Sequence, residues 1–355
     1  MLRCMYAGIS GMKVNQTKLD VIGNNIANVG TTSFKASSAR FRDMLYQNTG
    51  EATSVTATKG GTNAKQVGLG AQVSSINKVM GQGNALSTGR SLDVCIDGDG
   101  YLLTGSGFVD YSGGNNIDET TNSLTPTTGA DKGAMDILYT RDGNLTLDSQ
   151  GNLLTADGRR VMGYAVTDGT QTTSIDPASG KILSVNADAV DKTTGKSSVA
   201  VVGANGTDTK LVPLKVPDTV YGSGSDTAGQ PVKKFEIGKD GLITVILGDG
   251  SRAAVGQIAL ATFKNPEGLI SVGGNLLQKS ANSGPEIIRN GVGTDGTTDN
   301  SKGFGDFIQG ALEGSNVDLT EQFTDMITAT RSFQAASKMV TTGDEILQTI
   351  TGLMR

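Results

Sequence analysis

The stretch LTEQFTDMITATRSFQAASKMVTTGDEILQTITGLM, residues 319–354, places an apolar side chain at every seventh position. The repeating residues are Leu319, Met326, Phe333, Val340, Leu347 and Met354. The other end of the chain repeats the pattern with Met5, Met12, Leu19 and Ile26. A seven-residue apolar period is typical of helices that pack on other helices. We therefore expect a helix at each end, with these residues in the core of a polymer. The alternative is an ordinary pair of amphipathic helices on one globular core.

The region between the two helices is predicted to be glycine-rich β structure. Ten Asp-Gly or Asn-Gly dipeptides lie between residues 97 and 296, and such dipeptides are strong signals of hairpin turns. Four short apolar runs within residues 137–164 predict a meander of four strands. The N-terminal helix is expected over about residues 3–28. Candidate N-caps for the C-terminal helix are Ser315, Asn316 and Asp318.

The composition argues against an enzyme. The 355 residues contain 50 glycines but no histidine and no tryptophan. Without histidine the chain lacks the commonest general base and a principal ligand of zinc, copper and haem. No local motif marks a serine or cysteine nucleophile, so a hydrolase would need a catalytic cluster that the chain does not display. We expect no catalytic residue, no cofactor and no metal.

Charge is distributed unevenly between the two ends. Residues 1–47 hold six basic and two acidic side chains, whereas residues 311–355 hold three basic and six acidic ones. Opposite signs favour pairing of the ends with each other or with neighbouring copies. No basic run with interleaved aromatics suggests nucleic-acid binding, and no apolar stretch predicts membrane insertion or a cleaved signal peptide.

Two further features have simple readings. Cys4 lies in a predicted helix and Cys95 in a predicted strand, so we expect two thiols rather than a disulfide.

Residues 97–100 (DGDG) resemble part of a calcium loop. The spacing of ligands that an EF-hand requires is not met, and a tight turn explains these residues better.

Several motifs together resemble the bacterial flagellar rod and hook proteins. The N-terminal signature spans residues 9–35, and the C-terminal one begins at residue 310. Ser33 stands where the family usually has a glycine, which suggests that the turn here does not require a positive φ angle. The motif residues that carry the resemblance most clearly are Asn24, Asn25, Ala27, Asn28, Phe34 and Lys35, followed by Ser315, Asn316, Val317 and Asp318.

The resemblance implies a mainly β chain with terminal α-helices and discontinuous β domains closed by a helical coiled-coil domain. The expected parts are a terminal helical core domain (1–34 and 315–355), a linker or extended segment (35–66), an inner β domain (67–165 and 256–314) and an inserted outer β domain (166–255). Gly/Thr/Ser-rich joints at 48–63 and 290–301 would let the β domains tilt relative to the helical core.

The resemblance also implies a function. We expect a structural subunit of the extracellular flagellar hook, which polymerises into a flexible curved tube that transmits torque from rod to filament. The insert at 166–255 favours the hook over the distal rod, which is the first alternative; a secreted β-rich adhesin is the second. Implied partners are other copies of the chain, the distal rod protein, the hook cap, the hook-length ruler, the hook–filament junction protein and the flagellar export apparatus. The helices are expected to order fully only on assembly.

Some hooks of this family, notably in spirochaetes, join a cysteine to a lysine of a neighbouring subunit as lysinoalanine. The resemblance makes Cys95 a candidate for such a crosslink and Lys78 a possible partner. The alternative is that Cys95 is a small buried apolar residue in a strand.

Overall fold

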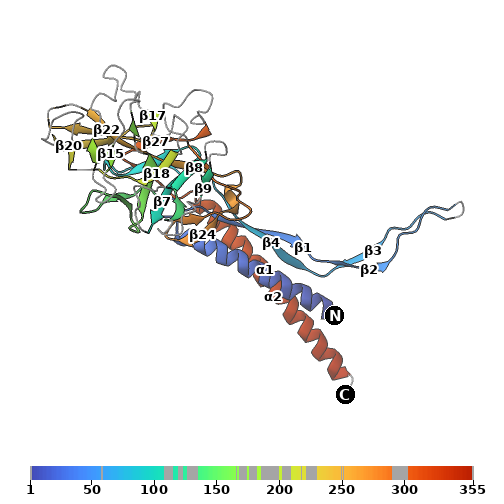
Figure 1. Ribbon diagram of the computed structural model, residues 1–355. Helices are drawn as coiled ribbons and strands as arrows, with labels where there is room; N and C mark the ends of the chain where they lie inside the picture. The colour runs from blue at the N-terminus through green and yellow to red at the C-terminus, as the bar shows by residue number, and fades with distance from the viewer. Residues whose placement is uncertain are drawn as a thin grey trace. The chain divides into compact units, whose positions relative to one another are not determined.

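The computed structural model divides the chain into two compact units. The helical unit comprises Met1–Gly81 with Ser315–Arg355, and the β unit comprises Gln82–Gly314. Both units are drawn in Figure 1. The structure describes residues 2–56, 59–107, 115–118, 123–125, 135–164, 166–167, 174–175, 182–184, 200–201, 209–216, 218–220, 230–248, 250, 252–289 and 303–353.

The helical unit is built on two long helices that lie side by side, α1 (Leu2–Ala27) and α2 (Leu319–Leu353) (Figure 1). The carboxylate of Asp318 accepts hydrogen bonds from the backbone N–H groups of Thr320 (2.8 Å) and Glu321 (3.4 Å). Asp318 is thus the N-cap among the three candidates, because it satisfies donors that the first turn leaves unpaired.

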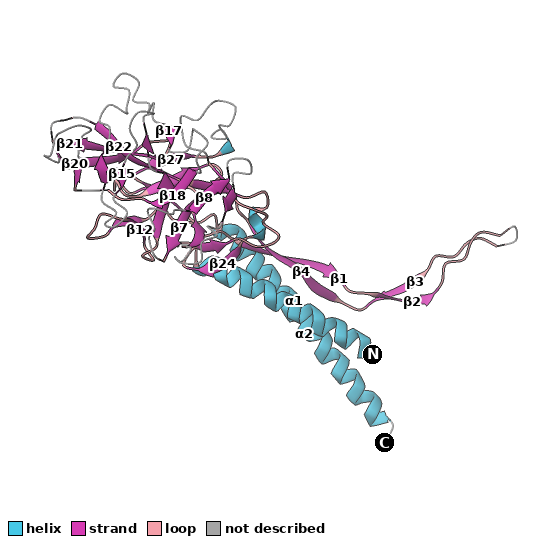
Figure 2. Cartoon of the chain, in the orientation of Figure 1, coloured by secondary structure: helices cyan, strands magenta, loops and turns pink. Residues whose placement is uncertain are grey.

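A two-stranded ribbon follows α1 within this unit (Figure 2). Strand β1 (Ser37–Asp43) pairs antiparallel with β4 (Ala71–Lys78), and β2 (Tyr46–Gly50) pairs with β3 (Lys65–Gly68). Bridges between Thr53 and Thr62 continue the pairing toward the tip. The stretch 48–63, expected as a joint between the helices and the β domain, therefore belongs to the helical unit, and its described residues pair within the ribbon. The other expected joint, 290–301, lies outside the described residues.

The β unit contains many short strands and one 3₁₀ turn. They are β5 (Ala85–Ser87), β6 (Val94–Asp97), β7 (Tyr101–Ser106), β8 (Asn115–Asp118), β9 (Ser123–Thr125), β10 (Asp136–Thr140), β11 (Leu145–Leu147), β12 (Leu153–Thr155), β13 (Arg160–Tyr164), β14 (Val166–Thr167), β15 (Ser174–Ile175), β16 (Ile182–Ser184), β17 (Ala200–Val201), β18 (Thr209–Pro213), β19 (Thr219–Val220), β20 (Gln230–Ile237), β21 (Leu242–Leu247), β22 (Arg252–Ile258), β23 (Leu260–Thr262), η1 (Pro266–Gly268), β24 (Ile270–Gly273), β25 (Leu276–Gln278), β26 (Ile287–Ile288), β27 (Asp306–Gln309) and β28 (Ala311–Glu313).

The largest sheet formed by the described strands has the main order β19-β20-β21-β22-β13-β7-β10-β25-β24. Strands of the 209–258 region thus continue the sheet that holds β7, β10 and β13. Their apolar side chains share one core, in which Val245 packs in the same cluster as Leu102 and Leu145. Burial of this common face stabilises the β unit.

The predicted four-strand meander is only partly correct. Strands β11, β12 and β13 pair in sequence, but β10 pairs with β7 and β25 instead of β11. The Asp142-Gly143 signal does not form a tight hairpin, because the carbonyl of Gly143 accepts a hydrogen bond from the N–H of Val94 (3.0 Å) and draws the chain away. A local turn signal is overridden here by a long-range pairing.

The expectation of a mainly β chain with a helix at each end is confirmed. Both cysteines are outside any disulfide, as expected. In the described part of the chain, neither helix is long and apolar enough to cross a membrane.

Candidate assembly surface

The two helices approach closely because small residues line their contact. A Cβ added at Gly8 of α1 would lie 3.1 Å from Cγ2 of Val340 and 3.4 Å from the carbonyl oxygen of Ala336. A Cβ added at Gly11 would touch the Cβ of Ala336 at 3.8 Å. The absence of a side chain on these glycines lets the two helices approach each other closely at these positions.

Two heptad residues have a described contact across the helix pair, because Val340 lies against Gly8 and Met5 lies against Gly343. The half-buried heptad residues are Met5, Met12, Leu19 and Ile26 on α1 and Met326, Phe333, Val340 and Leu347 on α2. Leu319 remains exposed, and Met354 lies outside the described residues. The seven-residue stripe of α2 therefore faces the chain's own α1 at least in part, so it is not reserved for neighbouring copies.

α2 also carries exposed apolar side chains outside the first heptad series. They are Phe323, Ile327, Met339, Ile346, Ile350 and Leu353. Ile327 is 59% exposed and Leu353 is 82% exposed, which is unusual for large aliphatic side chains on one helix. Met339, Ile346 and Leu353 repeat every seven residues, so a search for a second apolar series would have found them, whereas Phe323 and Ile327 lie on another side of the helix.

One ion pair joins the two helices. The Nζ of Lys18 lies 3.2 Å from Oδ2 of Asp325, and both side chains are partly exposed. This contact agrees with the opposite charges of the two ends, although a solvent-accessible pair contributes little stability, typically about 0–1 kcal/mol.

Asn25 is the buried polar centre of the motif at the end of α1. Its side chain is enclosed, and its Nδ2 donates to the carbonyl of Ser37 (2.8 Å) and to Oε1 of Gln322 (3.0 Å). Its Oδ1 accepts from the N–H of Ser37 (2.9 Å). One amide thus ties together α1, the start of β1 and the first turn of α2.

The side-chain amide of Asn316 likewise ties segments together where the C-terminal segment begins. Its Oδ1 accepts from the N–H of Ala36 (2.7 Å), and its Nδ2 donates to the carbonyls of Val79 (2.7 Å) and Gly81 (3.2 Å). The buried Lys35 donates from Nζ to the same carbonyl of Gly81 (2.8 Å). These two motif residues fix the local backbone.

The remaining motif residues have lesser roles in the described contacts. Asn28 donates from Nδ2 to the carbonyl of Asn24 (2.9 Å) and so closes the last turn of α1. The Oγ of Ser315 accepts from the N–H of Val317 (3.3 Å). Ala27 is exposed and Phe34 is half-buried.

The inference drawn from Ser33 is wrong. Ser33 has φ of 55°, in the left-handed region, so the turn does adopt the conformation that glycine would adopt more easily. Serine occupies it because the surrounding contacts of this buried residue hold the backbone in place.

Cys95 is fully buried in β6, with its Sγ 3.8 Å from the carbonyl oxygen of Ile96. This burial matches the reading of Cys95 as a small apolar residue. Lys78 ends β4 in the other unit, and partial burial lowers its pKa. The proposed crosslink between these two residues stays a prediction.

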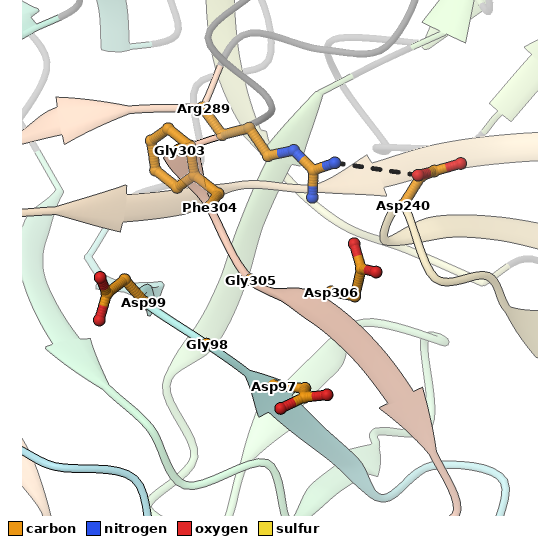
Figure 3. A pocket seen from close by; sticks show the side chains of 9 residues that line it. All are labelled: Asp97, Gly98, Asp99, Asp240, Arg289, Gly303, Phe304, Gly305 and Asp306. Carbon is orange, nitrogen blue, oxygen red and sulfur yellow. Dashed lines mark ion pairs between the residues drawn. The ribbon is translucent and has the colours of Figure 1, made fainter.

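A pocket of about 670 Å³ lies within the β unit, and Figure 3 shows the side chains that line it. Its carboxylates belong to Asp97, Asp99, Asp240 and Asp306. Arg289 enters from one wall, with Nη2 3.9 Å from Oδ1 of Asp240. Among the described residues, no group of three or more histidines, cysteines or acidic residues is arranged to hold a metal ion.

Three family models match the chain. They are the flagella basal body rod protein (residues 5–35), the flagellar hook protein FlgE/F/G D1 domain (residues 130–245) and the flagellar basal body rod FlgEFG protein C-terminal (residues 308–353). The D1 match includes most of the segment expected as an outer insert.

Individual relatives extend the likeness to the whole chain. The flagellar basal-body rod protein FlgG of Bacillus subtilis is 37% identical over 357 positions, covering 100% of both chains. The flagellar hook protein FlgE of Borreliella burgdorferi is 28% identical over 458 positions, covering 99% of this chain and 100% of that one. The crystal structure of Helicobacter pylori flagellar hook protein FlgE2 covers 64% of this chain and 100% of that chain, with 12% identity and a TM-score of 0.37. The chain belongs to the flagellar rod and hook protein family, whose members are structural parts of the flagellum and its basal body.

Proposed function

We propose that the chain is a hook-type subunit, which polymerises with other copies into a flexible tube that transmits torque. The observation that carries this proposal is the set of exposed apolar side chains of α2, among which Met339, Ile346 and Leu353 repeat every seven residues, on a helix that also contacts α1. Apolar stripes of this kind drive association, because burying them removes apolar surface from water. We propose that other copies of the chain cover these exposed side chains.

We prefer the hook because of the additional strands in the middle of the chain. Residues 209–258 supply strands β18 to β22, which extend the sheet beyond β13. We propose that the described strands of the 166–255 segment form the outward part of the β unit, with 82–165 and 256–314 as the inner part. Residues 67–81, which the sequence analysis placed in the inner β domain, belong to the helical unit. The terminal helices would then form the core of the tube.

The distal rod is the second candidate. It is favoured by the 37% identity to the Bacillus subtilis rod protein over the full length of this chain. The hook relative aligns over 458 positions, more than the 355 residues here, so it contains a segment with no counterpart in this chain.

The same partners are proposed whether the chain is a hook subunit or a rod subunit. They are the distal rod protein, the hook cap, the hook-length ruler, the hook–filament junction protein and the flagellar export apparatus. We propose a purely structural role with no catalysis, in agreement with the structural nature of the relatives.

Electron microscopy of the purified, assembly-competent chain tests these proposals. Curved tubes support the hook, short straight tubes support the rod, and failure to form any tube contradicts both. Ile327→Asp should abolish tubes while leaving the β unit folded, because it places a charge among the exposed apolar side chains of α2.

Phe333→Asp should also abolish tubes, through the contact between the helices. Thr328→Asp is the matched control, because Thr328 is an exposed polar neighbour of Ile327. Intact tubes from Ile327→Asp would contradict the assigned surface.

A further inference from the structure

The lining of the pocket in the β unit carries an excess of negative charge. One guanidinium group, that of Arg289, and the aromatic ring of Phe304 lie among four carboxylates. The carboxylates belong to Asp97, Asp99, Asp240 and Asp306, all of which are exposed. A ligand that enters the pocket from solvent can therefore contact them.

Two of these carboxylates repel each other. Asp306 of β27 lies directly opposite Asp97 of β6 in an antiparallel strand pair. Like charges at directly opposed positions destabilise such a pair. Gln82 donates from Nε2 to Oδ1 of Asp97 (3.2 Å), but a neutral amide does not remove the charge. A cationic group bound in the pocket would relieve this repulsion.

Arg289 gives an independent indication of a ligand. Its side chain is 5% exposed and extends into the pocket, as Figure 3 shows. Its Nη2 lies 3.9 Å from Oδ1 of Asp240, which is too long for a hydrogen bond. Its Nε and Nη1 are buried and have no hydrogen-bond partner among the described residues. A buried charged donor without an acceptor costs free energy, so an acceptor that entered here would be stabilised.

The ligand that satisfies both requirements carries a cation and a hydrogen-bond acceptor. An arginine or lysine on an extended peptide has both, because its side chain is cationic and its backbone carbonyl accepts hydrogen bonds. A cavity of about 670 Å³ accommodates such a side chain. Phe304 adds an aromatic ring, on which a guanidinium group can stack.

The ribbon of the helical unit presents such a segment. Arg40 and Arg42 of β1 are exposed and flank Phe41, which is 38% exposed. A bulge between Arg40 and Phe41 interrupts the pairing of β1 with β4, and bulges re-aim side chains. Among the described strands β1 pairs only with β4, so the carbonyl groups along its other edge have no strand partner.

We propose that the pocket of one copy binds Arg40 of a second copy, with a carbonyl of the β1 edge as the acceptor for Arg289. The guanidinium of Arg40 would lie between the carboxylates of Asp97 and Asp306. The contact is heterologous, because a pocket on one copy receives a strand of another, and such contacts can continue from copy to copy. This proposal rests on the proposed association of copies and adds a charged contact to the apolar one on α2.

Cross-linking between two variants of the full-length chain tests the contact. Both carry Cys4→Ser, which removes the exposed thiol, while Cys95 is buried. One carries Gly303→Cys at the pocket, where no atom lies within 4 Å of the Cβ position, and the other carries Ser38→Cys at an exposed site of β1. A short bismaleimide is added to an equal mixture under assembly conditions. Mass spectrometry then measures the yield of the mixed product, which joins the pocket of one copy to the ribbon of another.

Charge reversal should control this yield. Arg40→Glu in the ribbon copy should lower it about fivefold or more, and so should Asp306→Arg in the pocket copy, because each places like charges in contact. The two reversals together should restore the product. Lys13→Glu in the ribbon copy is the matched control, because it makes the same change in net charge at an exposed site of α1 and should leave the yield unchanged.

A yield that ignores the reversals, or that the paired reversal does not restore, would overturn the proposal. A single chain that carries both new cysteines should form no internal cross-link in dilute solution, and an internal product would place the contact within one copy instead. Electron microscopy of the same mixtures separates this proposal from the proposed function. Tubes without the charge-dependent product contradict the pocket contact alone, the product without tubes contradicts the tube-forming function alone, and absence of both contradicts both.

Discussion

Gly343 of α2 gives Met5 of α1 room to cross it: a Cβ added at Gly343 would lie 2.9 Å from Cγ of Met5. Gly343 is one of the buried residues of α2, although glycine is a poor helix former. Close approach of the two helices, rather than helix propensity, explains the glycine at this position.

Gly343→Val should therefore destabilise the helix pair by about 1–3 kcal/mol, because added atoms in a packed contact force the helices apart. Urea unfolding followed by far-ultraviolet circular dichroism measures the effect. Gly352→Ala is the matched control, because no atom lies within 4 Å of its Cβ position. That variant should gain up to about 1 kcal/mol from helix propensity alone. Equal behaviour of the two variants would contradict the packing argument.

The left-handed backbone of Ser33 predicts a difference between two variants that both remove its hydroxyl group. Ser33→Gly should be more stable than Ser33→Ala by about 0.5–1 kcal/mol, after allowance for the larger entropy of glycine in the unfolded chain. Chemical denaturation of both variants under the same conditions measures it. If Ser33→Ala proved the more stable one, the φ of 55° would not carry a strain cost.

Glu313→Gln should be severely destabilising, because it leaves the buried guanidinium of Arg141 without a counter-charge. Removal of one partner from a buried pair typically costs about 3–5 kcal/mol. Glu236→Gln is the control, because Glu236 pairs with Lys234 on the surface and its loss should cost less than about 1 kcal/mol. Calorimetry measures the unfolding temperatures of the two variants. Similar unfolding temperatures would contradict the assigned role of Glu313.

Alkaline pH should unfold the β unit. Burial raises the pKa of Tyr101 to about 12, and burial also raises the pKa of Tyr139 and Tyr164. A raised pKa means that the folded state holds the phenolic proton more tightly. The resulting stability is fully present below the ordinary tyrosine pKa of about 10 and is lost as the pH rises through the folded value.

Ultraviolet absorbance of tyrosinate, recorded together with circular dichroism, checks this expectation. The buried tyrosines should ionise late and together with loss of structure. The exposed Tyr6 serves as the internal reference for ordinary ionisation. Ionisation of every tyrosine near pH 10, with the fold retained, would show that these rings are not buried.

The sequence predicted the two helices well because their signals are local. The apolar period places α1 and α2, and Asp318 marks the start of α2. The short strands β11, β12 and β13 were also visible, since each is a compact apolar run between turn residues.

The sequence could not reveal features that depend on residues far apart in the chain. The pairing of β10 with β7 and β25 and the anchoring of Gly81 by Asn316 have no local signature. The sequence does show the apolar residues of α2 outside the first heptad series, but only the structure shows that they are exposed.

The hydrogen bond from Asn25 to Gln322 joins residues that are 297 positions apart. During synthesis the N-terminus emerges first. Nearly all residues between Asn25 and Gln322 have therefore been made before Gln322 becomes available to α1. Loop closure over such a span comes late, whereas the hairpins of the β unit close over short distances. The β unit is therefore expected to fold first, and α1 is expected to pack on α2 only after α2 has been made.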